Sequence, residues 1–97
     1  MKAIMLITDS EVMPEFERVL LTEGHQGFTV VPAVAGSGRH GLKTGDRVHP
    51  GSSSLLLTVT AEASAARLLA LLRRVRDDGG YGDRTRAWSF AVEEADW

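Results

Sequence analysis

Glycine and basic residues gather in one segment, GSGRHGLKTGDRVHPGS at residues 36–52. Glycine allows turns in which successive backbone N–H groups face one concave site, and such a site attracts anions. A nearby guanidinium adds a bidentate donor for a phosphate or a carboxylate. A connection of this length in a compact domain is usually functional. The segment therefore predicts a loop that binds an anionic effector or a target protein. The alternative is a solvated hairpin connection.

A second segment of similar composition is YGDRTR at residues 81–86. Its Arg84 and Arg86 could bind a phosphate. An almost equally good interpretation is a basic turn whose arginines pair with Asp83 or with the acidic tail at residues 93–97. Tyr81 has two interpretations as well, which are stacking on a base and packing against the domain.

Metal binding and catalysis have weaker support in the sequence. Imidazole is a common metal ligand, but the three histidines, at positions 25, 40 and 49, stand in predicted turns, where histidine is ordinarily a surface residue. No Ser-His-Asp order, H-E-x-x-H or P-loop pattern is present, and adjacent carboxylates occur only at element ends, as Asp77-Asp78 and Glu93-Glu94. The G-x-G-x-x-G pattern at residues 36–41 is not followed by a helix, which excludes a dinucleotide-binding fold. We therefore expect that the protein is not an enzyme.

The composition is that of a globular protein. The length of 97 residues predicts one domain over residues 1–97. The contents of 43% hydrophobic and 25% charged residues are globular averages. The absence of cysteine excludes disulfides, thiolate metal sites and thiol catalysis. A net charge of −2 disfavours generic nucleic-acid binding. No apolar run approaches a bilayer span and no signal peptide is visible, so we expect a cytoplasmic protein without membrane insertion.

Hydrophobic periodicity predicts four strands and two helices. The strands are expected at residues 2–8, 28–35, 54–60 and 86–92, and the helices at residues 61–78 and between Ser10 and Gly24, with a start as late as Met13 because of Pro14. Asp9 or Ser10 is expected to cap the first helix, and Pro32 to place the second strand at a sheet edge or bulge.

This order of elements predicts an α+β, ferredoxin-like βαββαβ domain. In such a domain a four-stranded antiparallel sheet carries both helices on one face, and the first and third strands lie centrally. Both of these central strands are apolar on their two faces, yet no further segment is available to cover the second face. We therefore expect a homo-oligomer, with a closed trimer as the best fit. On the last strand, Trp88 and Phe90 are expected to belong to the sheet core rather than to a stacking platform for single-stranded nucleic acid.

Three stretches of the chain resemble the PII-like signalling proteins, a family of small trimers that report nitrogen, carbon or energy status. KAIMLIT, followed by a helix that ends in EGHQGFTVVPAVAGSGRHG, looks like the family's first helix, its glycine turn and the G-x-G-R opening of its signalling loop. YGDRTR is similar to its glycine-aspartate loop, and FAVEE is similar to its last strand. The resemblance spans almost the whole chain and implies a regulatory protein.

In that family, adenine nucleotides bind in clefts between neighbouring subunits, between the base of the loop and the glycine-aspartate loop. The resemblance implies a protein without an obligatory cofactor that binds an adenine nucleotide as effector and signals through residues 36–52 to a target such as a transporter or an enzyme. The implied nucleotide or anion ligands are Gly36, Gly38 and Arg39 on one side of the cleft and Gly82, Asp83, Arg84 and Arg86 on the other. The implied partner contacts are His40, Lys43, Arg47 and His49.

The sequence departs from the family pattern in its loop. The loop is shorter than usual and contains no tyrosine, so control by modification of a loop tyrosine is not expected, and residues 51–54 stand where a lysine is usual. Two alternatives remain open on the same fold. One is a metal-binding or metal-responsive trimer that uses the histidines and acidic groups, and the other is a structural interaction module without a ligand.

Overall fold

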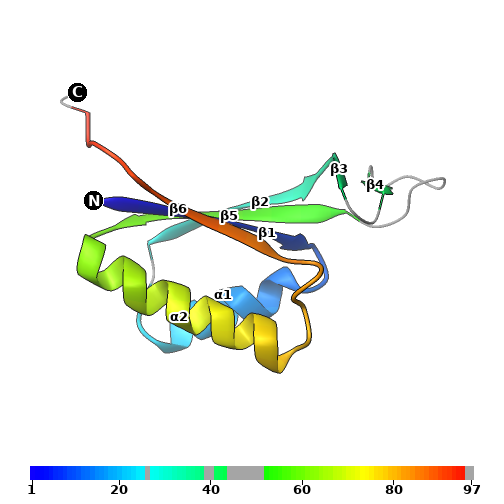
Figure 1. Cartoon of the computed structure of the whole chain (residues 1–97), viewed down its shortest axis with the longest axis horizontal. Coiled ribbons are helices and arrows are strands. Elements are labelled where there is room, and N and C mark those ends of the chain that lie inside the picture. Colours follow the sequence, from blue (N-terminus) through cyan, green and yellow to red (C-terminus); the bar gives the residue numbers. More distant parts are fainter. Residues whose placement is uncertain (26, 39–40, 44–51, 96–97) are drawn as a thin grey trace.

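The computed structural model describes residues 1–25, 27–38, 41–43 and 52–95. The elements are β1 (Lys2–Asp9), α1 (Met13–Thr22), β2 (Phe28–Val34), β3 (Gly36–Gly38), β4 (Gly41–Lys43), β5 (Ser53–Thr60), α2 (Glu62–Asp78) and β6 (Arg86–Ala91). Four antiparallel strands form one sheet in the order β2-β5-β1-β6, and β3 pairs with β4 in a separate hairpin. Both helices lie against one face of the sheet (Figure 1). The expected βαββαβ fold is confirmed, and the β3–β4 hairpin is an addition that periodicity did not predict.

The first helix begins at Met13, the latest start that the sequence allowed. The N-cap residue, Val12, makes no side-chain capping bond, and its backbone N–H donates to the carbonyl oxygen of Asp9 at 2.9 Å. Pro14 lies in the first turn, where backbone N–H groups have no acceptor within the helix, so the absence of an N–H in proline costs no hydrogen bond. The prediction that Asp9 or Ser10 caps the helix is therefore wrong, because a turn separates both residues from the helix start.

The hydrophobic core lies between the helices and the sheet. Its main side chains are Ile4 and Leu6 of β1, Phe16 and Leu20 of α1, Leu56 of β5, and Ala65, Leu68, Leu71 and Leu72 of α2. Tyr81, in the turn after α2, packs against this core, and its ring centroid is 6.4 Å from that of Phe16. The packing interpretation of Tyr81 is therefore confirmed. Within the described part of the chain, neither helix is long and apolar enough to cross a membrane.

The second strand is irregular where the sequence predicted it. β2 is an edge strand, and its register against β5 shifts between Val31 and Val34, around Pro32. Ala33 inside this shift has a φ of 55°, a left-handed conformation that residues with a side chain rarely adopt. Proline is tolerated here because an edge strand leaves one side of its backbone unpaired.

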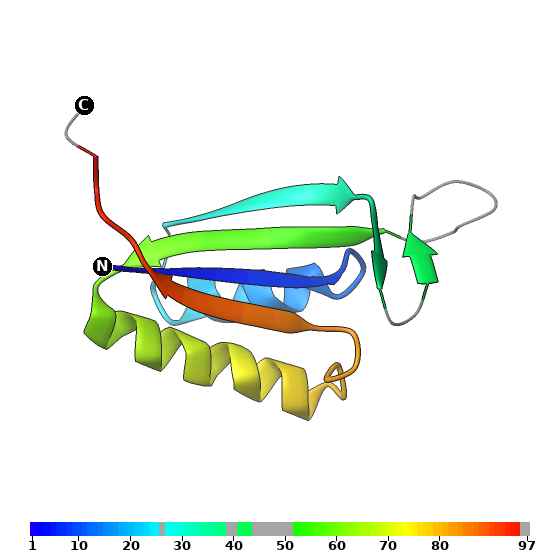
Figure 2. The same ribbon diagram turned by 45° about the horizontal axis from the view of Figure 1, so that its top comes forward.

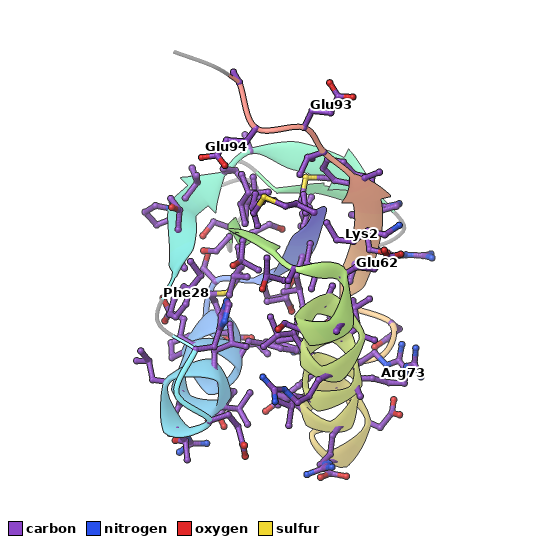
Figure 3. The ribbon with its side chains drawn as sticks, turned by 90° about the vertical axis from the view of Figure 1, so that its left-hand side faces the viewer. Lys2, Phe28, Glu62, Arg73, Glu93 and Glu94 are labelled. Atoms are coloured by element: carbon purple, nitrogen blue, oxygen red, sulfur yellow. The ribbon has the colours of Figure 1, made fainter. Side chains whose placement is uncertain are left out.

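The face of the sheet away from the helices is also apolar. In register, Trp88 lies beside Met5, and Met5 lies beside Leu57, so the three side chains form a row across that face. We call this surface the open face, and it carries Met5, Ile7, Val31, Leu55, Leu57, Val59, Trp88 and Phe90. Seen end-on, the helices lie on one side of the sheet, and Glu93 and Glu94 lie on the opposite side (Figure 3).

The expectation that Trp88 and Phe90 lie in the core is wrong for the single chain. Their exposed fractions are 47% and 43%. The alternation on β6 was recognised correctly, since both residues point to one face. That face is the open face, however, so no helix covers them.

Candidate functional site

The two segments predicted to bind an anion leave the sheet at the same end. β2 and β1 end there and β5 begins there, since Val34 pairs with Ser53, and Ser53 also pairs with Asp9. β6 begins at this end as well, at Arg86. Figure 2 shows the β3–β4 hairpin and the turn before β6 beyond this end of the sheet.

Within one chain, however, the strand that leads into the loop and the strand that follows the basic turn lie at opposite edges of the sheet, whereas the loop returns to the sheet at β5, beside β1. β2 leads into the loop and β6 follows the basic turn, and they are the two outer strands, with β5 and β1 between them. At about 4.8 Å per strand spacing, the outer strands are roughly 14 Å apart. The sheet therefore separates the strand before the loop from the strand after the turn.

The structure describes only part of the predicted site. Gly36 and Gly38 are the first and last residues of β3, and Gly36 pairs with Lys43, the last residue of β4. Gly82 and Asp83 lie in the turn between α2 and β6. Arg39, His40, Arg47 and His49 lie outside the described residues.

Arg84 lies beside two carboxylates, one at the end of β1 and one in the connection between β1 and α1. One of its guanidinium nitrogens is 3.7 Å from Oδ2 of Asp9 and 3.5 Å from Oε1 of Glu11. The Arg84 side chain is 48% exposed, so each long ion pair contributes less than about 1 kcal/mol to stability. Asp83 and the acidic tail were the partners expected from the sequence, whereas these two carboxylates were not expected. An anion that binds Arg84 competes with both of them.

Arg86 is in a different environment. It pairs in register with Ile7, so its side chain leaves β6 on the open face. It makes no ion pair with any carboxylate of the described residues. Of the two described arginines of the turn, Arg86 is therefore the one whose charge is more available to an anionic ligand.

Hydroxyl groups hold this end of the molecule together. The Ser10 hydroxyl lies 2.7 Å from that of Ser52 and 2.8 Å from that of Ser54, and the buried hydroxyls of Thr8 and Thr85 are 2.8 Å apart. These bonds attach the start of β5 and the turn before β6 to the end of β1. These bonds were not predicted, because their partners are 42 to 77 residues apart and leave no local pattern in the sequence.

His25 has a structural partner. Its Nε2 is 2.9 Å from the hydroxyl of Thr58, which donates to the carbonyl oxygen of Gly27 at 2.5 Å. The imidazole therefore links the turn after α1 to β5. Among the residues that the structure describes, no group of three or more histidine, aspartate or glutamate side chains is arranged to hold a metal ion.

Comparison with known proteins gives one family. The model of the family described as nitrogen regulatory protein P-II matches residues 1–95. Among curated proteins, none matches the chain.

Solved structures share the fold. The chain is 17% identical to CPII of Thiomonas intermedia K12 bound to ADP and bicarbonate, with a TM-score of 0.67 over 92% of this chain and 82% of that one. A second structure of CPII, a nitrogen regulatory PII-like protein bound to ADP, AMP and bicarbonate, has 17% identity and a TM-score of 0.64 over 94% and 86% of the two chains. A DUF3240 family protein of Shewanella baltica OS155 has 19% identity and a TM-score of 0.68 over 97% and 91%.

Proposed function

The chain belongs to the nitrogen regulatory protein P-II family, and from this premise we propose that it is a cytoplasmic regulatory protein that acts as a homotrimer. An adenine nucleotide binds as effector between neighbouring subunits, and the segment at residues 36–52 passes its occupancy to a target protein. No chemical step on the nucleotide is part of this function.

One observation carries the proposal. The segment that leads into the loop and the turn before β6 share one end of the sheet but adjoin its opposite edges. The interface of a cyclic trimer is heterologous, so it joins two different surfaces of the subunit. If the β2 edge of one copy faces the β6 edge of the next, the loop base and the basic turn line one cleft. In a single chain β2 and β6 do not face each other, because β5 and β1 lie between them.

The open face supports the trimer. It exposes large apolar side chains in the single chain, and contiguous exposed apolar surface marks an interaction site. Burial of that surface against other copies would remove it from water, which stabilises the assembly by roughly 25 cal/mol per Å² of apolar area.

The residues of the two segments suit a polyphosphate. Backbone N–H groups of Gly36, Gly38 and Gly82 can approach phosphate oxygens closely, and the guanidinium of Arg86 offers a bidentate donor. Arg39 supplies a second guanidinium. Arg84 binds the phosphate once it has separated from the carboxylates of Asp9 and Glu11. The CPII proteins of the same fold bind ADP, and this supports an adenine nucleotide as the effector here.

The test is a thermal-shift titration of the full chain with ATP, ADP and AMP and, in parallel, with divalent transition metals. A nucleotide at a hundred times its dissociation constant adds about 2.7 kcal/mol to the native state, which raises the Tm of a domain of this size by about 10 °C. Arg86→Gln is expected to weaken nucleotide binding about tenfold or more, because it removes a charged hydrogen-bond donor. Arg67→Gln, an exposed arginine of α2, is the control and is expected to bind as wild type does.

The same titration contains the outcomes that reject the proposal. No shift with any nucleotide at millimolar concentration would do so, as would equal binding by Arg86→Gln and Arg67→Gln. A shift with a divalent transition metal alone would favour the metal-responsive alternative. Indifference to nucleotides and metals would favour an interaction module without a ligand.

A further inference from the structure

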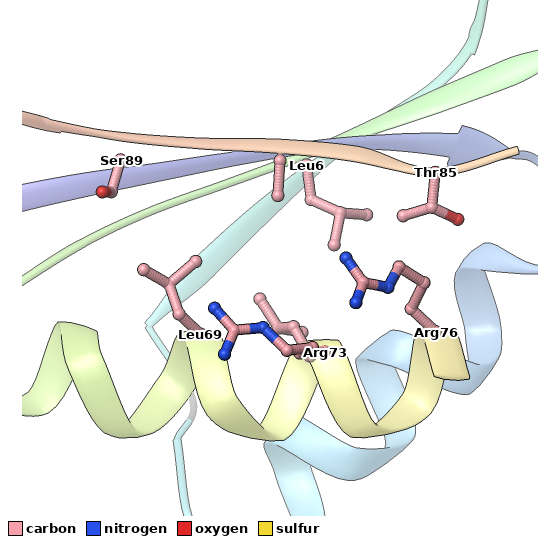
Figure 4. A pocket seen from close by; sticks show the side chains of 8 residues that line it. Leu6, Leu69, Arg73, Arg76, Thr85 and Ser89 are labelled. Carbon is pink, nitrogen blue, oxygen red and sulfur yellow. The ribbon is translucent and has the colours of Figure 1, made fainter. Parts of the chain in front are cut away.

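A groove lies between α2 and β6, on the helix side of the sheet. Its volume is about 230 Å³. Leu6 and Leu69 form part of its apolar lining, and Ala87 and Ser89 line it from β6. Arg73 and Arg76 of α2 complete it, and Figure 4 shows both guanidinium groups in the space between the helix and the strand.

The groove exists because few side chains fill the space between β6 and α2. Ala87 and Ser89 face α2, but both are small and every residue of β6 is exposed. α2 packs mainly against α1 and β1. The small side chains leave a space beside the helix, and the two long arginine side chains line it while they stay partly exposed to solvent.

The charges in the groove are not balanced. The Nε of Arg76 donates to Oδ1 of Asp77 at 2.8 Å, and this hydrogen bond holds the pKa of the Asp77 carboxyl below its usual value. Arg73 makes no ion pair with any carboxylate in the described part of the chain. Two like charges three residues apart on a helix disfavour each other by a few tenths of a kcal/mol. The groove therefore has two guanidinium groups beside an apolar lining, and only that of Arg76 is paired with a carboxylate.

We propose that this groove binds a small organic oxyanion, a carboxylate or a phosphate monoester that carries an apolar group. The guanidinium of Arg73 holds the oxyanion, that of Arg76 gives a second contact, and the hydroxyl of Ser89 donates from β6. The apolar group of the ligand packs on Leu69 and Ala87. Arg86 leaves β6 on the opposite face, so the guanidinium that the proposed nucleotide cleft depends on lies outside this groove, which Thr85 of the same turn borders.

The probe for the test is phenyl phosphate, which combines an oxyanion with an apolar ring. It is titrated into the ¹⁵N-labelled full chain, and backbone amide shifts are followed by NMR. Saturable shifts are expected at Leu69, Ala87 and Ser89. Inorganic phosphate, which has no apolar group, is expected to bind more weakly.

Two variants test the contacts, one by removing a charge from the groove and the other by filling the groove. Arg73→Gln is expected to weaken phenyl phosphate binding about tenfold, because a charge-assisted hydrogen bond is lost. Its control is Arg74→Gln, which removes the neighbouring exposed arginine outside the groove and is expected to bind as wild type does. Ser89→Leu fills the groove without changing its charge and is expected to abolish binding, while its circular dichroism spectrum stays that of the wild type.

Several results would overturn the proposal. One is the absence of saturable shifts with phenyl phosphate. Another is equal affinity in Arg73→Gln and Arg74→Gln. A third is a set of shifts confined to Gly82, Asp83 and Arg84, none of which lines the groove, because that would assign the phosphate to the basic turn instead. Nucleotide binding through Arg86 is measured independently, so either proposal can fail alone.

Discussion

At the scale of single residues, Gly79 determines where the Tyr81 ring can lie. A methyl group at Gly79 would lie 2.1 Å from Cε2 and 2.6 Å from Cζ of Tyr81. This ring packs against the core beside Phe16, so it has little freedom to move away. Gly79→Ala is therefore expected to lower the free energy of unfolding by about 1–3 kcal/mol, as overpacking does. Urea denaturation of both proteins measures the difference.

Gly82 in the same turn is the matched control for this substitution. No atom lies within 4 Å of the position that its Cβ would take, and its φ is not in the left-handed region. Gly82→Ala is expected to change the free energy of unfolding by less than about 0.5 kcal/mol. Equal stability of Gly79→Ala and Gly82→Ala would mean that the Tyr81 ring moves aside without loss of packing.

At the scale of elements, the irregularity in β2 stores strain. Ala33 has a φ of 55°, and a left-handed conformation costs a residue with a side chain about 1–2 kcal/mol. Ala33→Gly removes that strain, although glycine loses more conformational freedom on folding, about 0.4–1 kcal/mol. We expect a net gain of about 0.5–1 kcal/mol in the free energy of unfolding, measured by urea denaturation.

Ala35→Gly is the control for the strain argument. Ala35 is exposed and has no positive φ, so the added flexibility of the unfolded chain is the only expected effect. It should lower the free energy of unfolding by about 0.4–1 kcal/mol. A loss of stability in Ala33→Gly as large as that in Ala35→Gly would show that the bulge carries no strain.

The sequence predicted the elements that have a strong local signal. Continuous apolar runs marked the central strands, and Pro14 and Pro32 marked a helix start and an irregular edge, because each fixes φ and removes a donor. The β3–β4 hairpin has three-residue strands rich in glycine, which carry no strand signal. Alternation on β6 showed that Trp88 and Phe90 share a face, but the position of the helices decides whether that face is covered.

Less of the candidate site could be predicted from the sequence, because several of its contacts join segments that are distant in the chain. The glycines and arginines of the turn stand together in the sequence, so they were found. The partners of Arg84, which are Asp9 and Glu11, come from another segment that the fold brings near. The hydroxyl contacts between Thr8 and Thr85 are equally distant in sequence. Such contacts depend on strand order and register, which periodicity alone does not determine.

At the scale of the whole molecule, the open face decides the assembly. Leu57 is 38% exposed in the middle of this face, between Met5 and Thr29 in register. In the proposed trimer it is buried against other copies, where a carboxylate without a partner is strongly disfavoured. Leu57→Glu is therefore expected to reduce the mass measured by light scattering at micromolar concentration from that of a trimer to that of a monomer.

Leu21→Glu separates this effect from a general effect of a new charge. Leu21 is 53% exposed on α1, the element that covers the other face of the sheet, so its substitution should leave the trimer intact. Because the proposed nucleotide cleft needs two copies, the Leu57→Glu monomer should also fail to bind nucleotide. Arg86→Gln should instead lose the nucleotide while it keeps the mass of the trimer. A monomeric wild type, or a Leu57→Glu monomer that binds nucleotide as tightly as wild type does, would contradict a cleft built between subunits.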